Sequence, residues 1–297
     1  MVVNEVYKIN ECKGKEEKDS PFRVYENEEF KNVPMNKSRG HYELIQLDKL
    51  IVVMTEKLLV VTSMMLQDAI RGLGVEDVEQ ADIQKRLMVL AESDFLSKHA
   101  FVSGTSKASF YAYKIGWRGI GYLRAAGIKP RLNDYLMTSD ATHIKRILSV
   151  GQYVVKQGID IDAYKMCEIV LSPSITPQIP TNKIFRPQAL LQLEEGTIFV
   201  ESVRQNENWK QEILDKLKRI SAVMKAKNQN ISIRNPKLIL IAETVDHMKE
   251  IMELIDSEYF YYTIPIYYTA DSLTYANPEK CLYEVKKKTI WESLFVG

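Results

Sequence analysis

Residues 62–90 read TSMMLQDAIRGLGVEDVEQADIQKRLMVL, and their pattern indicates how the first half of the chain folds. Thr62 can cap a helix whose apolar residues recur at helical spacing, and the Gly-Leu-Gly break at 72–74 predicts a turn. After the turn, Asp77 followed by Gln80 is typical of a capping box that opens the next helix. The inward-facing positions of that helix are Ile83, Leu87 and Leu90.

The segments on either side of this pair of helices add further predicted helices and strands. An apolar helical pattern begins near Asp48, and two short segments rich in aromatic and β-branched residues, 95–102 and 109–115, follow the pair and predict a hairpin. Helix, helix, turn, helix and hairpin is the order of a winged helix-turn-helix, whose third helix lies in the DNA major groove. A further helix is expected at 116–126, with Trp117, Ile120, Leu123 and Arg124 at helical spacing.

Six polar residues of the third helix and the hairpin are candidates for contact with double-stranded DNA. Glutamine can pair with adenine, and lysine with guanine or phosphate. The charge balance supports a basic face, since residues 97–150 hold nine Lys or Arg against two Asp or Glu, whereas 41–96 hold five against ten. The six candidates are Gln80, Gln84, Lys85, Lys98, His99 and Lys107.

The beginning of the third helix is acidic, which opposes this interpretation. Carboxylates near a helix N-terminus also favour the helix dipole, so these residues can serve helix stability and face away from DNA. Winged helices act in protein contact and dimerisation as well, and that alternative stays open. The acidic residues are Glu76, Asp77, Glu79 and Asp82.

The domain plan expected from the sequence has three parts. Residues 1–40 mix Lys and Glu with few apolar residues and predict a weakly ordered arm. The winged helix-turn-helix domain is expected at 41–135. An α/β domain is expected at 136–297, in the order helix, three strands, amphipathic helix and strand, which is the core order of the restriction-endonuclease-like fold.

The nuclease-like site of the second domain is incomplete in the sequence. Such sites hold Mg²⁺ with two carboxylates, while a lysine two residues after the second one stabilises the attacking water. The corresponding positions here are Gln188, Glu201 and Val203, so that only Glu201 fits. We therefore expect the domain to be non-catalytic, with Glu201 as a weak catalytic candidate, no metal and no cofactor. A Mg²⁺-dependent nuclease is kept as an alternative.

Short motifs in both halves resemble the replication-relaxation family of plasmids and other mobile elements. They lie between about residues 48 and 255 and comprise Thr62 with IQKRL at 83–87, YAYKIG at 111–116, Gly119 to Gly127, a helix beginning at His143, FRPQA at 185–189 and IFVE at 198–201. The resemblance implies a winged helix joined to a restriction-endonuclease-like domain. It also implies a DNA-binding accessory or regulatory role in replication, transfer or transcription control.

The remaining composition narrows the class of protein. No run of about eighteen apolar residues and no apolar N-terminal segment is present, so we expect a cytoplasmic protein without membrane contact. Three scattered cysteines and four histidines match no metal-ligand spacing. The expected partners are double-stranded DNA, a second copy of the chain, and replication or transfer proteins. A protein-interaction scaffold remains the further alternative.

Overall fold

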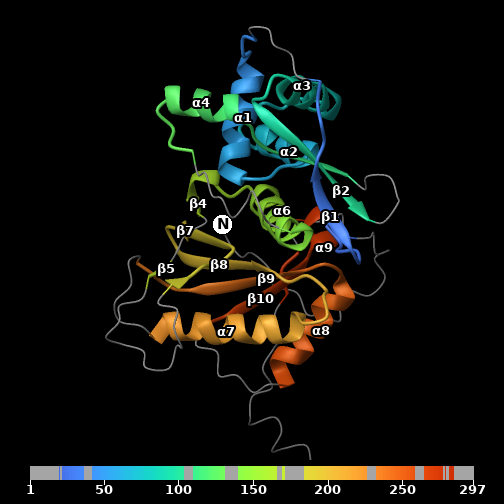
Figure 1. Cartoon of the computed structure of the whole chain (residues 1–297). Helices are drawn as coiled ribbons and strands as arrows, with labels where there is room; N and C mark the ends of the chain where they lie inside the picture. The colour runs from blue at the N-terminus through green and yellow to red at the C-terminus, as the bar shows by residue number, and fades with distance from the viewer. Residues whose placement is uncertain are drawn as a thin grey trace, which may run out of the picture. The chain divides into compact units, whose positions relative to one another are not determined.

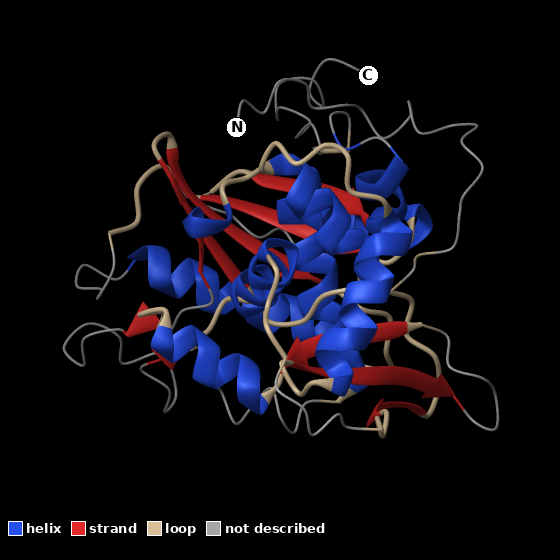
Figure 2. Ribbon diagram, turned by 90° about the horizontal axis from the view of Figure 1, so that it is seen from above, coloured by secondary structure: helices blue, strands red, loops and turns tan. Residues whose placement is uncertain are grey.

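The chain forms two compact units, described here from a computed structural model. The first unit spans 22–165, and the second combines 1–21 with 166–297. Each unit mixes helices with a sheet, so the fold is of the mixed α/β, α+β kind (Figures 1 and 2). The structure describes residues 20, 22–36, 42–103, 110–130, 140–165, 169–170, 184–225, 232–257, 264–276, 278 and 281–283.

Three helices open the globular part of the first unit, as the sequence predicts. They are α1 (Gln46–Leu58), α2 (Ser63–Gly72) and α3 (Gln80–Glu92). The predicted cap of α2 is confirmed, because the Thr62 hydroxyl accepts a hydrogen bond from the Met65 N–H at 3.3 Å. The predicted capping box of α3 is wrong: Glu79 is the N-cap residue, and its side chain makes no capping hydrogen bond.

The predicted hairpin is present and belongs to a three-stranded antiparallel sheet. Strand β2 (Leu96–Ser103) pairs with β3 (Tyr111–Ile115) on one side and with β1 (Glu28–Asn32) on the other. Strand β1 lies within the segment expected to be a weakly ordered arm. Its Phe30 ring stacks on His99 and packs on Phe101, so the strand is held by side chains of β2 that the composition of the arm does not reveal.

Two more helices complete the first unit. Helix α4 (Trp117–Ala125) packs against α1 and β2, and α6 (Ala141–Lys156) packs against α2 and β1. A short 3₁₀ turn and β4 (Tyr164–Lys165) follow. Because α6 covers elements of the first unit, this unit continues to Lys165, whereas the sequence interpretation placed the boundary near 135 and assigned this helix to the second domain.

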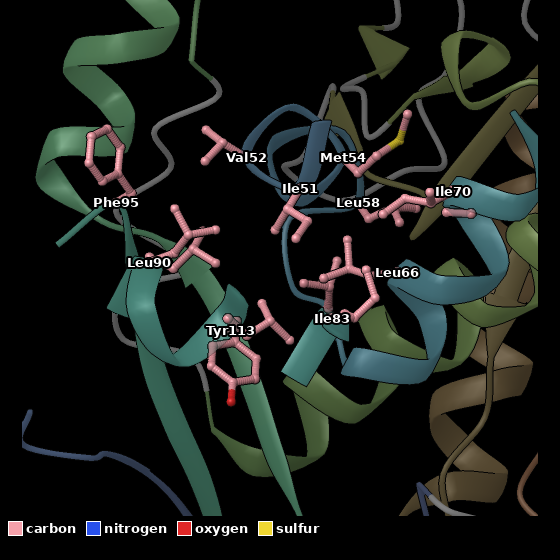
Figure 3. Close-up of a cluster of buried hydrophobic side chains, with 14 of the residues drawn as sticks. Ile51, Val52, Met54, Leu58, Leu66, Ile70, Ile83, Leu90, Phe95 and Tyr113 are labelled. Atoms are coloured by element: carbon pink, nitrogen blue, oxygen red, sulfur yellow. The ribbon is translucent and has the colours of Figure 1, made fainter. Parts of the chain in front are cut away.

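One apolar core joins α1, α2 and α3 to the sheet. Figure 3 shows side chains of the three helices pointing toward one another and toward Phe95 and Tyr113. The inward positions expected for α3 are confirmed, since all three are fully buried. A backbone bridge between Val61, which lies between α1 and α2, and Tyr113 ties the helices to β3.

The second unit is built on a sheet with strands in the order β10-β9-β8-β7. These strands are β7 (Ala189–Leu193), β8 (Gly196–Ser202), β9 (Lys237–Ala242) and β10 (Ile266–Ala270). Strand β7 runs antiparallel to β8, while β8, β9 and β10 are parallel to one another. The continuous apolar run of β9 therefore lies between two neighbours, as expected for a central strand.

Helices connect the parallel strands of this sheet. They are α7 (Trp209–Lys225) between β8 and β9, α8 (Val245–Ser257) between β9 and β10, and α9 (Asp271–Ala276) after β10. Helices α7 and α8 lie along one face of the sheet (Figure 1). Two short strands, β5 (Ile169–Val170) and β6 (Ile184–Phe185), pair with each other. In the part of the chain that the structure describes, no helix is long and apolar enough to span a bilayer.

Candidate functional site

Helix α3 exposes two of the residues predicted to contact DNA. Gln84 and Lys85 are exposed, whereas the neighbouring Ile83 and Leu87 are buried in the core. Gln80 is half-buried, and its side-chain amide lies 3.4 Å from the Ser63 hydroxyl at the start of α2. Gln84 and Lys85 are therefore available to a partner, while Gln80 links the beginnings of the two helices.

Arg86, the next residue of α3, is turned inward. Its guanidinium donates to both carboxylate oxygens of the buried Asp48 on α1, at 2.8 and 2.7 Å. Asp48 also accepts from the Tyr42 hydroxyl and from the Ile45 N–H at the start of α1. This bidentate pair fixes α3 against α1 and leaves Lys85 as the neighbouring exposed cation.

The residues of and beside the β2–β3 hairpin that were predicted to contact DNA differ in how far their side chains are exposed. Lys98 is half-buried, and its ammonium lies 3.3 Å from the Met88 sulfur and 3.9 Å from the centre of the Tyr111 ring. His99 stacks on Phe30 at 4.7 Å, and burial together with the charge of Lys114 lowers its pKa to about 4. At neutral pH His99 is therefore an uncharged packing residue of the sheet. Lys107 lies outside the described residues.

The acidic residues before and within the first turn of α3 are all exposed. Glu79 takes the N-cap position, and Asp82 lies in the first turn, where a carboxylate interacts favourably with the helix dipole. None of the four makes an ion pair within the described part of the chain. The exposed surface at this end of α3 is thus negative: Glu76, Asp77, Glu79 and Asp82.

Gln188 and Glu201, the two residues at which the sequence predicts an incomplete nuclease-like site, do lie together in the second unit. Gln188 directly precedes β7, Glu201 lies near the end of β8, and the Gln188 N–H donates to Glu201 Oε1 at 3.2 Å. The Gln188 carboxamide is also fully engaged: its oxygen accepts from the Ser202 N–H at 2.6 Å, and its nitrogen donates to the Ser202 carbonyl at 3.1 Å. The side chain therefore extends the pairing of β7 with β8.

A lysine that the sequence interpretation missed occupies the other side of Glu201. Lys216 on α7 places its Nζ atom 2.5 Å from Glu201 Oε2, and Glu201 itself is fully buried. The expected position for such a lysine was 203, where Val203 is buried apolar packing. The sequence feature that could have indicated this lysine is the amphipathic helix after β8, in which Lys216 directly precedes the inward-facing Leu217.

This arrangement does not fit a magnesium site. Both Glu201 oxygens already accept hydrogen bonds, one of them from a cation, and Gln188 adds a neutral carboxamide. Within the described residues, no three His, Cys, Asp or Glu side chains are grouped so that they could hold a metal ion. The site therefore has the chemistry of a buried ion pair.

A second buried polar cluster lies at the carboxyl ends of the parallel strands. Arg204 follows β8 and donates to Asp271, which follows β10, and to the Ser202 hydroxyl. Ser20 donates to the same Asp271 carboxylate at 2.6 Å, so Ser20 belongs to this cluster. Burial, reinforced by the charge of Arg204, lowers the pKa of His247 to about 3.

An open cavity of about 470 Å³ lies at the opposite end of the β7–β8 hairpin from Glu201. Its wall includes Thr197 at the start of β8 and Arg234 before β9. Neither Gln188 nor Glu201 lines it.

Comparisons of the chain with protein families, with curated proteins and with solved structures found no match.

Proposed function

We propose that this chain is a DNA-binding accessory or regulatory protein of a plasmid or other mobile element, resembling the replication-relaxation family. The observation that carries the proposal is the two-sided character of α3. Gln84 and Lys85 face solvent while Ile83 and Leu87 anchor the helix in the core. An amide and an ammonium on a rigid exposed helix suit base edges and phosphates in a major groove.

The topology of the first unit supports a winged helix-turn-helix. The helices α2 and α3 form the helix pair, β2 and β3 form the wing, and the Val61–Tyr113 bridge joins the segment between α1 and α2 to the wing strand β3. The connection between α2 and α3 contains Gly74 at φ 86°, a conformation that glycine adopts without strain. In this arrangement Lys98 on β2 lies at the wing.

The second unit supports a restriction-endonuclease-like domain that acts by contact. Antiparallel β7 and β8, then α7, then parallel β9 is the expected core order. The donors that a nuclease would offer to a metal are occupied, because Glu201 is paired with Lys216 and Gln188 with Ser202. We therefore expect supercoiled and single-stranded DNA to remain intact after incubation with Mg²⁺ or Mn²⁺, and cleavage would contradict this part of the proposal.

The test of DNA binding uses the full chain and labelled duplex fragments from its native genome, selected by pull-down. Affinity should fall steeply with salt, since phosphate contacts release counterions, and Lys85→Ala should lower the slope of that fall by about one unit. Gln84→Ala should reduce discrimination between sites by about 1–3 kcal/mol.

A matched control for Lys85 is Lys49→Ala. Lys49 is an exposed lysine on α1, so its loss changes the net charge equally without altering α3. We expect the control to leave the salt slope of the wild type. Binding of the wild type that is absent, or that is insensitive to salt, would refute the proposal.

Protein contact by the first unit is a second candidate with an observation of its own. Leu73 and Val75, in the connection between α2 and α3, are exposed by 54% and 42%, and the exposed carboxylates of Glu76 and Asp77 follow them. If this surface forms a homodimer, Leu73→Lys should yield a monomer in light scattering. A wild-type monomer that binds duplex DNA tightly would count against this candidate.

A further inference from the structure

Helix α4 carries an aromatic side chain that core packing does not explain. Trp117 is 70% exposed, more than any other large apolar side chain in the described part of the chain. Ile120 and Leu123 of the same helix are buried, so the helix is anchored without the indole. The expected helix is confirmed, and the indole lies outside its buried face.

The glycines of this segment fall into two groups. A Cβ atom on Gly116 would lie 2.4 Å from the Asp94 carbonyl oxygen, and one on Gly119 would lie 2.2 Å from that of Phe95, so both glycines are required for the close approach of α4 to β2. Gly121 has open space around its Cβ position. It lies one turn after Trp117 on the same exposed face, and it leaves the surface beside the indole bare.

Helix α4 and the residues directly after it carry positive charge. Residues 116–130 contain Arg118, Arg124 and Lys129 and no Asp or Glu, whereas Lys114 of the preceding strand is buried in the sheet. Arg124 is exposed two helical turns after Trp117, about 10 Å along the axis, and helical side chains lean toward the N-terminus, hence toward Gly121. The acidic residue beside the helix start is Asp94, whose backbone carbonyl accepts from the Arg118 N–H at 3.0 Å.

We propose that the α4 face, formed by Trp117, Gly121 and Arg124, binds an unpaired nucleotide of single-stranded DNA. The base stacks on the indole over the bare surface at Gly121, and the Arg124 guanidinium pairs with a neighbouring phosphate. A base within a duplex has both faces covered by its neighbours, so an exposed indole selects an unpaired one. The positive charge favours a polyanion. This site is separate from the duplex contact proposed for α3 and does not rest on it.

The test measures binding of the full chain to a fluorescently labelled twenty-residue oligothymidylate by anisotropy at low salt. Trp117→Ala should weaken binding about tenfold or more, while Trp117→Phe should retain most of the affinity. Arg124→Ala should reduce the salt slope by about 0.7. Gly121→Leu should also weaken binding, although replacing glycine with leucine favours the helix and should not lower the unfolding midpoint.

Two controls separate this site from general effects. Tyr25→Ala removes another exposed aromatic residue of the same unit, and Lys49→Ala removes another exposed cation, so both should bind as the wild type does. Lys85→Ala should affect duplex binding alone, which distinguishes failure at α3 from failure at α4. Absence of oligothymidylate binding, or a folded Trp117→Ala variant that binds like the wild type, would overturn the proposal. So would loss of self-association by that variant without loss of DNA binding.

Discussion

Both units contain a buried carboxylate that pairs with a cation from a later helix, Asp48 in the first unit and Glu201 in the second, but the two carboxylates accept different numbers of hydrogen bonds. Asp48 accepts four hydrogen bonds in the described part of the chain, two of them from the Arg86 guanidinium. Glu201 accepts two there, one of them from the Lys216 ammonium. The first carboxylate is held from several directions, and the second depends on a single cation.

The two ion pairs therefore differ in rigidity: the Asp48–Arg86 pair has a fixed geometry, whereas the Glu201–Lys216 pair can exchange its cation. A planar guanidinium donates to both oxygens in a fixed geometry, whereas an ammonium is a point charge on a flexible stem. The Lys216 side chain is 26% exposed, so it can turn toward solvent or toward an incoming phosphate. We infer that Asp48 and Arg86 maintain the orientation of α3, and that the partly hydrated Lys216 holds Glu201 less firmly.

The largest effect is expected from Arg86→Met. Removing the guanidinium leaves the Asp48 charge buried without its cation, which typically costs about 3–5 kcal/mol. Urea unfolding measures the loss, and hydrogen exchange of α1 and α3 peptides locates it in the first unit. Adding Asp48→Asn should recover part of the stability, because the uncompensated charge disappears. A loss of less than about 1 kcal/mol in the free energy of unfolding would contradict a stabilising role for the Asp48–Arg86 pair.

Lys216→Met should cost less, about 2 kcal/mol, because the lysine is partly hydrated and Glu201 keeps the Gln188 N–H. Trp209 is buried in this unit and reports its unfolding when Trp117 and Trp291 are replaced by Phe, which leaves the chain with one tryptophan. A matched control is Lys218→Met on the exposed side of α7. Equal losses for the two lysine variants would refute the importance of the pair.

Acid should destabilise both units through one histidine in each. The pKa of His99 is lowered to about 4 and that of His247 to about 3, each mainly by burial, while the unfolded chain titrates near 6.5. Below pH 6.5 the unfolded state therefore binds more protons, and the free energy of unfolding falls as the pH falls. Between pH 7 and pH 4.5 we expect each histidine to lower the free energy of unfolding by about 2 kcal/mol.

The check on this prediction is unfolding at both pH values in His99→Phe and His247→Phe. Phenylalanine preserves a ring against Phe30 or Trp209 but does not titrate. Each variant should lose less stability on acidification than the wild type does. The loss attributed to His247 should continue to about pH 3, beyond that of His99. Unchanged pH dependence in both variants would contradict the assignment.

The smallest effect is expected from Gln188→Leu, about 1–2 kcal/mol. The substitution removes two hydrogen bonds to the buried backbone of Ser202, at 2.6 and 3.1 Å, while preserving the N–H bond to Glu201. Unfolding followed by Trp209 fluorescence measures the loss. If the variant is as stable as the wild type, the carboxamide does not hold β7 to β8.

Periodicity predicted most helices and strands of both units because their apolar faces are continuous in sequence. It placed the apolar face of α7 correctly and identified β9 as a buried strand. It did not predict β1, whose EEFKN sequence has a single apolar residue, Phe30. That strand exists because β2 offers a backbone edge and an aromatic surface, which are properties of a partner about seventy residues away.

The candidate site could be predicted only in part for the same reason. Exposure of Gln84 and Lys85 follows from the helical period of α3, and the period also places Trp117 and Arg124, seven residues apart, on one face. The spacing alone does not show that the Trp117 face is the exposed one, because that depends on what packs against Ile120 and Leu123. The pairing of Lys216 with Glu201 depends on how a helix lies on a strand, and no spacing in the sequence specifies it.

The buried ion pair of Lys145 and Glu28 limits how far the chain can be truncated before the first unit loses stability. Lys145 on α6 is completely buried and also donates to the Arg23 carbonyl, so the beginning and the end of the first unit are joined by charge. A fragment limited to 41–135 would lose both members of the pair and the helix that covers α2. A fragment that retains these contacts together with the whole first unit runs from about residue 22 to 165.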